Sequence, residues 1–311
     1  MPCACPIAAN AEKNNGARMS ADTPTEIIKD KNGNVLKRAE ILPYLDFIKG
    51  DAHTHQICGD VRIVPQAWSP QLENKRDVLI YLPPSYATSE KKYPVLYMQD
   101  GQNLFDDATA FAGHDWHVDE TMERMSADGY EAIVVGIYHS GEARLNEYNP
   151  FPGKWHSLGN EYVKFLCDSL KPFIDRNFRT HTEPNATAIL GSSMGGLISL
   201  YAFFHRPDIF GLCGAMSPSL FVGRGAILND VRAAEFHIGK IYLDNGTREP
   251  SARKMYELLR EKGYRVRTDL KYVAERGGHH TESAWARRFP GAVRFLLKDW
   301  KEKNLPSRKK K

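Results

Sequence analysis

The amino-acid sequence predicts an α/β fold in which helices cover both faces of a mostly parallel central sheet. Short runs rich in branched and aromatic residues alternate with helical patterns along the chain. Several of these runs are apolar at successive positions, as in strands that are buried on both faces. The apolar share of 42% and the charged share of 26% are those of an ordinary globular protein, which excludes a wholly disordered, collagen-like or membrane-embedded chain.

The expected elements follow from these patterns in chain order. The expected strands are DVLIYLP at 77–83, YPVLYM at 93–98, EAIVVGIY at 131–138, ATAIL at 186–190, and the runs 211–216, 240–243 and 268–274. The expected helices are 118–125, 161–178, 195–204, 252–262 and 290–300. Parallel sheets of this kind bind ligands at the carboxyl ends of their strands, so we look for chemistry in the loops that follow strands.

One catalytic domain is the simplest organisation for this chain. Its 311 residues lie near the upper limit of what a single hydrophobic core serves, and we find no internal repeat. We expect a polar, loosely ordered leader at 1–38, a catalytic domain at 39–303 and a basic tail at 304–311.

The charge pattern and the apolar runs argue against nucleic-acid and membrane partners. Lys and Arg number 42 against 38 Asp and Glu, and part of the net charge of +4 lies in the basic tail. A nucleic-acid-binding protein normally concentrates basic residues on one face, whereas both signs are interspersed here. No run approaches the roughly 20 apolar residues of a membrane span, and no signal-peptide stretch opens the sequence, so we expect a cytoplasmic protein.

The five cysteines do not form a structural pattern. Their number is odd, and no two of them stand in a C-x-x-C pair. This argues against a disulfide framework and against a structural zinc site. We expect neither a metal nor another cofactor.

A G-x-S-x-G motif at 191–195 supplies the candidate nucleophile, Ser193. The bare pattern is weak, but here an expected strand ends at Gly191 and an expected helix follows at once. A serine at such a strand–turn–helix elbow is held in a strained conformation, and glycines two positions to either side leave room for the backbone. A serine hydroxyl is a poor nucleophile unless a base accepts its proton, so a partner histidine is required.

The best histidine candidates are His279 and His280, which follow a glycine pair directly after the strand expected at 268–274. The histidine in turn needs an acid that fixes its tautomer. Glu249 is the preferred acid and Asp244 the alternative, since both lie in or near the loop after the preceding strand. The chain order serine, acid, histidine is that of α/β-hydrolases and differs from the order in chymotrypsin-like and subtilisin-like enzymes.

Two backbone N–H groups are candidates for the oxyanion hole. The N–H of Met194 follows the nucleophile directly, and the N–H of Gln102 lies in the loop after the strand expected at 93–98. An ordinary Asp-Gly turn is the alternative explanation for that loop.

Several motifs together resemble the putative-esterase family of α/β-hydrolases. They are YLPPSY at 81–86, YPVLY at 93–97, DGQNLF at 100–105, GSSMGG at 191–196 and HTESAW at 280–285. The family includes enterochelin-type trilactone esterases, feruloyl and acetylxylan esterases, esterase D-like enzymes and mycobacterial mycolyltransferases. The resemblance runs from about residue 55 to residue 298 and implies an α/β-hydrolase fold for this domain.

The resemblance also implies roles for individual residues. It assigns Ser193 as nucleophile, His280 rather than His279 as base because of its spacing before Trp285, and Glu249 as acid. It assigns Gln102 and Met194 as oxyanion donors. The acid position varies within the family, so Asp244 stays an alternative.

The loop at 139–150 resembles the family as well and is expected to overhang the site, because it follows a strand. Arg144 in this loop is a candidate for binding an anionic or aromatic acyl group, with a brace between Arg144 and Glu147 as the alternative. Tyr148 and Trp116 are further substrate-binding candidates, although a core position for Trp116 is the favoured alternative.

The sequence therefore predicts a serine carboxylic-ester hydrolase that acts through an acyl-enzyme on short acyl, aryl (feruloyl or acetyl) or sugar-linked esters. A siderophore trilactone esterase is the alternative within the class, and a noncatalytic ligand-binding member of the fold is the alternative outside it. A metal-dependent hydrolase built on the H-x-H pattern of His53 and His55 is a weaker alternative. The expected partner is a small-molecule or carbohydrate-linked ester, and a homodimer is compatible with the sequence.

Overall fold

The computed structural model describes residues 40–153 and 156–302. The leader expected at 1–38 and the tail expected at 304–311 lie outside these residues, so the division of the chain into leader, domain and tail stays a prediction. Among the described residues, no helix combines the length and the apolar character needed to cross a membrane.

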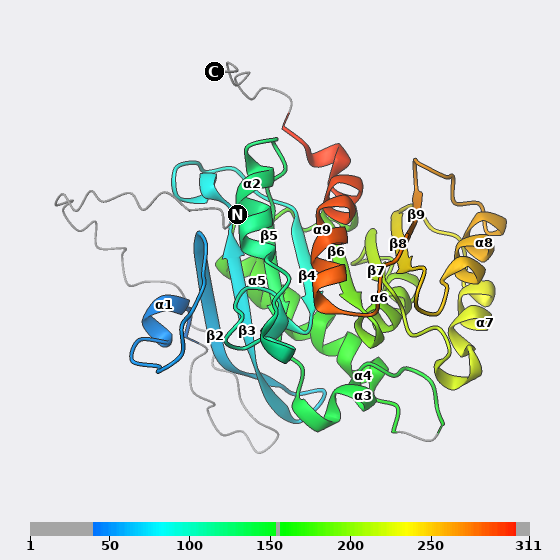
Figure 1. Cartoon of the computed structure of the whole chain (residues 1–311), viewed down its shortest axis with the longest axis horizontal. Coiled ribbons are helices and arrows are strands. Elements are labelled where there is room, and N and C mark those ends of the chain that lie inside the picture. Colours follow the sequence, from blue (N-terminus) through cyan, green and yellow to red (C-terminus); the bar gives the residue numbers. More distant parts are fainter. Residues whose placement is uncertain (1–39, 154–155, 303–311) are drawn as a thin grey trace. The chain divides into compact units, whose positions relative to one another are not determined.

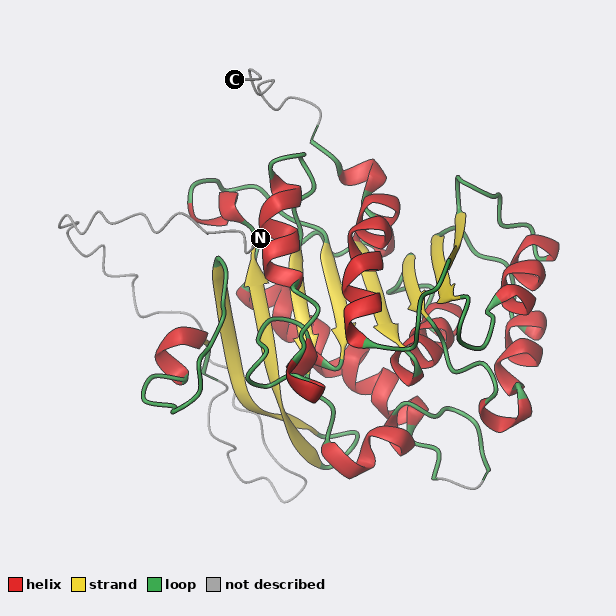
Figure 2. Cartoon of the chain, in the orientation of Figure 1, coloured by secondary structure: helices red, strands yellow, loops and turns green. Residues whose placement is uncertain are grey.

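The described residues contain a nine-stranded sheet flanked by helices (Figure 2). The strands are β1 Leu42–Pro43, β2 Asp60–Ser69, β3 Asn74–Leu82, β4 Val95–Gln99, β5 Ile133–Ile137, β6 Thr187–Ser192, β7 Leu212–Met216, β8 Lys240–Gly246 and β9 Leu270–Glu275. Their order is β1-β2-β3-β5-β4-β6-β7-β8-β9. The first four strands in this order pair antiparallel and the rest pair parallel, so the predicted mostly parallel sheet is confirmed.

Helices cover both faces of this sheet, as predicted. They are α1 Tyr44–Phe47, α2 Val118–Ser126, α3 Arg144–Glu147, α4 Gly159–Lys164, α5 Lys171–Asn177, α6 Met194–His205, α7 Ala226–Ala233, α8 Arg253–Glu261 and α9 Glu282–Leu296. Helices α2 and α9 lie in front of the sheet in Figure 1, and α5 and α6 lie behind it. Alternate residues of the strands point to the two layers: Leu96 and Met98 join the core cluster with α2 and α9, whereas Tyr97 packs on Phe210.

The short strand β1 and helices α1, α3 and α7 were not expected, and three further elements also differ from the expectation. Strand β2 was not predicted, because Pro65 interrupts its pattern; the structure places a register shift between Val64 and Ala67, the kind of bulge that tolerates a proline. The helix expected at 161–178 is α4, a π-helical segment Phe165–Leu170 and α5 in succession. The segment ends two residues before Pro172, whose missing N–H cannot serve an α-helical hydrogen bond.

Helix α9 begins eight residues before the expected position. A proline is favoured in the first turn of a helix, which placed the expected start at Pro290. In the structure Pro290 lies inside the helix, and Thr281 in extended conformation precedes the first turn. The earlier start matters for the site, because it puts Trp285 and Arg288 on a helix directly after His280.

Candidate active site

Ser193 occupies a sharp turn between β6 and α6. Its φ of 55° and ψ of −118° are strained for a residue with a side chain. The flanking glycines are required by packing: a Cβ on Gly191 would lie 2.7 Å from Gln99 Cγ, and a Cβ on Gly195 would lie 2.9 Å from Gln99 Cβ. The predicted strand–turn–helix elbow is therefore present, and it holds the Ser193 hydroxyl at the carboxyl end of the sheet.

His280 contacts both Ser193 and Glu249. It follows β9, and its Nε2 lies 2.9 Å from Ser193 Oγ, while its Nδ1 lies 2.5 Å from Glu249 Oε2. The edge of the imidazole packs on Trp285, with ring centroids 4.9 Å apart. The side chain is 41% exposed, so water and substrate reach the imidazole from the solvent.

Glu249 is buried and held as a carboxylate. Its side chain is 2% exposed. It accepts hydrogen bonds from the Ser217 hydroxyl at 2.8 Å and from the Gly246 N–H. Burial acts to raise the pKa of Glu249, but the hydrogen bonds from His280, Gly246 and Ser217 outweigh it and lower the pKa to about 2. The carboxylate is thus ionised at neutral pH and oriented toward His280.

Asp244, the alternative acid, has a different environment. It is fully buried, and it accepts the N–H of Ser217 at 3.1 Å. Burial raises its pKa to about 7, against the opposing effect of Arg288, whose Nε lies 3.4 Å from Oδ2. The structure thus brings Glu249, and not Asp244, to His280.

A second layer behind Glu249 was missed in the sequence. Arg288 Nη2 and Trp285 Nε1 each donate to Ser217 Oγ at 2.9 Å, and Ser217 donates to Glu249. The side chain of Arg288 is only 4% exposed. The signal that could have found it is the three-residue spacing of Trp285 and Arg288, which places both on one face of a helix.

The two oxyanion candidates lie in the segments that follow two neighbouring parallel strands, β6 and β4. Met194 is the first residue of α6, where backbone N–H groups lack a partner within the helix. Gln102 lies in the turn Gly101–Asn103 after β4, the strand next to β6. The start of α6 and the turn after β4 lie side by side: a Cβ added to Gly195 in α6 would lie 3.4 Å from Oδ2 of Asp100, which precedes the turn. The Gln102 side chain is turned toward the loop after β5, where its Oε1 lies 3.4 Å from the N–H of His139.

Comparison with known proteins shows the family of the chain. The model of the family described as "Putative esterase" matches residues 69–296, well over half of the chain. The chain belongs to this family. It is a carboxylic ester hydrolase, and its α/β-hydrolase fold is as predicted.

Three similar proteins give the range of the family. The esterase is 25% identical to protein YbbA of Bacillus subtilis (strain 168) over 71% of this chain and 92% of YbbA. It is 26% identical to an endo-1,4-beta-xylanase/feruloyl esterase of Xylanibacter ruminicola over 74% of this chain but only 30% of that protein. The crystal structure of the enterobactin esterase FES from Shigella flexneri with enterobactin has a TM-score of 0.62 at 21% identity, over 76% of this chain and 61% of that chain. The similarity to the enterobactin esterase shows a shared fold.

Arg144 of the esterase pairs with Asp100. Its Nε and Nη2 lie 2.6 and 2.8 Å from the two oxygens of Asp100, a bidentate arrangement. The alternative brace between Arg144 and Glu147 is wrong, because Glu147 instead pairs with Arg76 at 2.8 Å, both side chains fully buried. The side chain of Arg144 is 24% exposed, so a substrate would meet a guanidinium whose charge is already largely balanced.

Trp116 and Tyr148 lie in the interior, at 2% and 0% exposure. Trp116 packs on Trp285 with ring centroids 5.8 Å apart, which is the core position that the sequence left open. Tyr148 Oη accepts the N–H of Asp100 at 3.3 Å. Both were candidates for substrate contact, with a core position favoured for Trp116; at this burial neither ring offers a surface to a ligand.

A small cavity of about 20 Å³ lies beside the catalytic candidates of the esterase. It is lined by Ser217, Pro218, Ser219, Phe221, Glu249, Pro250 and His280. Phe221 is 67% exposed, and the Ser219 hydroxyl lies 3.2 Å from Ser193 Oγ. A larger cavity of about 450 Å³, near β9 and α9, includes none of these residues. Sequence reasoning missed Phe221 and Ser219, for which no motif gives a signal.

The two histidines of the H-x-H pattern take part in local contacts. His53 Nδ1 lies 2.6 Å from Asp51, and His55 Nδ1 lies 2.6 Å from Asp106. The sheet is open and mixed rather than an eight-stranded barrel, so the barrel that the metal-hydrolase alternative requires is not formed by the described residues.

Proposed function

We propose that the esterase is a serine hydrolase in which Ser193, His280 and Glu249 act as a catalytic triad. The observation that carries the proposal is the continuous contact from Ser193 Oγ through both nitrogens of His280 to Glu249. In this chemistry His280 accepts the hydroxyl proton as Ser193 attacks the acyl carbonyl. The buried carboxylate of Glu249 stabilises the imidazolium that forms.

The tetrahedral intermediate needs donors for its negative oxygen. The N–H groups of Met194 and Gln102 are the proposed donors, since both stand at the carboxyl ends of neighbouring strands beside Ser193. His280 then gives its proton to the departing alcohol, which leaves an acyl-enzyme on Ser193. A water molecule activated by the same imidazole releases the acid and restores the hydroxyl.

The proposed substrates are short acyl, aryl (feruloyl or acetyl) or sugar-linked esters. Support comes from the exposed ring of Phe221, which lines the same cavity as His280, and from the exposure of His280, which leaves the alcohol side of the ester in solvent. The relative named as a xylanase and feruloyl esterase is consistent with this class. Hydrolysis of a siderophore trilactone is the second candidate, favoured by the fold shared with the Shigella flexneri enterobactin esterase.

Purified protein tested on a panel of esters separates these candidates. The panel contains p-nitrophenyl acetate, methyl ferulate, acetylated xylan oligomers and a catecholate trilactone. We expect kcat/KM for the aryl and acetyl esters to exceed that for the trilactone. A trilactone kcat/KM above all the others would replace the proposed substrate class with the second candidate.

Ser193→Ala tests the proposed mechanism on the best substrate of the panel. We expect kcat to fall by about 10⁴ to 10⁶, because the hydroxyl forms the covalent intermediate. Asp244→Asn is the matched control for a carboxyl that does not contact His280. A Ser193→Ala protein that keeps more than about a tenth of the activity, or an Asp244→Asn change more damaging than Glu249→Gln, would contradict the assigned triad.

A further inference from the structure

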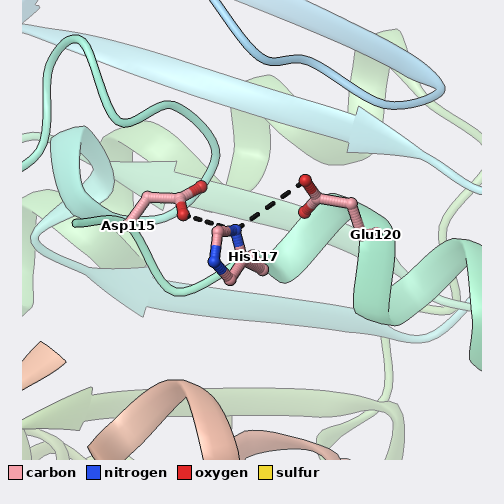
Figure 3. A group of neighbouring side chains, drawn as sticks. All are labelled: Asp115, His117 and Glu120. Carbon is pink, nitrogen blue, oxygen red and sulfur yellow. Dashed lines mark ion pairs between the residues drawn. The ribbon is translucent and has the colours of Figure 1, made fainter. Parts of the chain in front are cut away.

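Acidic side chains gather around the start of α2. Asp115 is 3% exposed, Asp119 is fully buried and Glu120 is half-buried. The carboxylates of Glu120, Asp107 and Asp106 lie close enough to Asp115 to interact with it electrostatically. The imidazole of His117 touches two of these carboxylates: its Nδ1 lies 2.6 Å from Asp115 Oδ1 and 3.8 Å from Glu120 Oε1 (Figure 3).

Helix α2 accounts for only part of this cluster. Asp119 and Glu120 lie in its first turn, where the helix dipole favours negative charge. Asp115 precedes the helix, and its carboxyl accepts the backbone N–H of His117. The buried Asp115 Oδ1 points toward His117 and lies against its imidazole Nδ1, with no further hydrogen-bond partner among the residues that the structure describes.

A buried carboxylate oxygen that has only an imidazole beside it can also bind a cation. One oxygen of Glu120, Oε2, is likewise buried and accepts no hydrogen bond within the described residues. Two buried carboxylate oxygens of this cluster, Asp115 Oδ1 and Glu120 Oε2, thus have room for a bond to a cation.

We propose that Asp115, His117 and Glu120 bind a divalent transition-metal ion of the zinc class. One ligand atom from each residue lies within 4.8 Å of the other two. Two carboxylate oxygens and one imidazole nitrogen are ligands that Zn²⁺ accepts, with water in the fourth position. Calcium and magnesium, which prefer oxygen ligands alone, fit this set less well.

The contacts need only a small adjustment to receive the ion. Around a tetrahedral zinc with bonds of about 2.1 Å, ligand atoms stand about 3.4 Å apart. The distances of 2.6 and 3.8 Å from His117 Nδ1 lie on either side of this value. The His117 side chain is 51% exposed, so the imidazole can rotate without disturbing the core.

The site lies outside the proposed hydrolytic machinery. The expected effect of the metal is stabilisation of the folded chain, because an ion that binds only the folded state raises its unfolding temperature. The adjacent residue Trp116 packs against Trp285 in the core, so an ion bound by Asp115 and His117 would hold the backbone on both sides of Trp116 in place. This effect is measurable without any ester substrate.

Isothermal titration of the metal-free full-length chain with zinc chloride tests the proposal. We expect one zinc per chain in the wild type, and about a hundredfold weaker binding, or more, after His117→Gln or Asp115→Asn. His114→Gln is the matched control, since His114 is an exposed imidazole on the same segment; it should bind zinc as the wild type does. Zinc should raise the Tm of the wild type and of His114→Gln, but not that of His117→Gln.

Two results would overturn the proposal. One is a wild-type Kd for zinc weaker than about 100 μM, roughly −5.5 kcal/mol. The other is equally tight binding by His117→Gln and the wild type, which would place the zinc elsewhere, for example on Cys3 and Cys5. His117 is exposed, so loss of its side chain is not expected to unfold the chain and confuse the result.

Discussion

Arg288 and Ser217 hold the carboxylate of Glu249 in one orientation. Ser217 Oγ accepts hydrogen bonds from Arg288 and Trp285. Its own proton is therefore directed at Glu249, to which it donates. Arg288 also lies between Glu249 and Asp244, at 3.5 and 3.4 Å. The guanidinium therefore acts on His280 only through other residues, as a positioning residue.

Arg288→Met is expected to lower kcat by about tenfold to hundredfold with little change in KM, because Glu249 loses its orientation while the substrate contacts remain. Arg288→Lys should recover part of the loss. Arg287→Met, on the exposed side of the same helix and paired with Glu275, is the control and should leave kcat unchanged. Steady-state kinetics that show a rise in KM alone would exclude the positioning role.

Glu249 should also leave a signature in stability against pH. Its pKa is about 2 in the folded chain and 4.5 as a free side chain, so the folded state gains stability above pH 4.5 and loses it as the pH falls toward 2. Glu249→Gln removes this term. We expect urea unfolding to show the variant roughly 3 kcal/mol less stable than the wild type at pH 7, with a smaller gap at pH 3. A gap that stays constant between these pH values would contradict the ionised, buried carboxylate.

Some helices and strands can be predicted from sequence patterns and others cannot. The buried parallel strands and α6 were predictable, because they are nearly continuous apolar runs and the G-x-S-x-G elbow fixes where β6 ends. Strand β2 was not, since a bulge at Pro65 and charged residues break its alternation. The early start of α9 was missed for the opposite reason: a proline that usually marks a helix start stands inside this one.

The tip of β8 and the loop after β9 make the closest approach in the site. A Cβ on Gly246 would lie 2.2 Å from the backbone oxygen of Gly278, two residues before His280. We expect Gly246→Ala to push this loop away and to lower kcat by about a hundredfold. Gly153→Ala is the control, because nothing lies within 4 Å of the added methyl. Equal kcat values for the two variants, measured on one substrate, would show that the loop is not held by this contact.

The molecule as a whole assembles its site from distant parts of the chain. Ser193 and His280 are 87 residues apart, and Glu249 lies between them in sequence, yet all three stand at the carboxyl ends of β6, β8 and β9. This convergence was predictable from the topology of parallel sheets and from the chain order of the three residues. The surroundings were not: Arg144 and Tyr148 were placed near substrate by their position in the loop at 139–150, whereas Tyr148 is buried and Arg144 pairs with Asp100, because side-chain burial depends on packing that no local pattern encodes.

The most direct test is covalent labelling of the purified esterase with diisopropyl fluorophosphate, followed by peptide mass spectrometry. If His280 activates Ser193, we expect one phosphoryl adduct, on Ser193. The enzyme should lose ester hydrolysis in step with the labelling, and the His280→Ala variant should be labelled far more slowly. An adduct on a different residue that abolishes activity, or an active enzyme that takes up no label, would contradict the proposed catalytic role of Ser193.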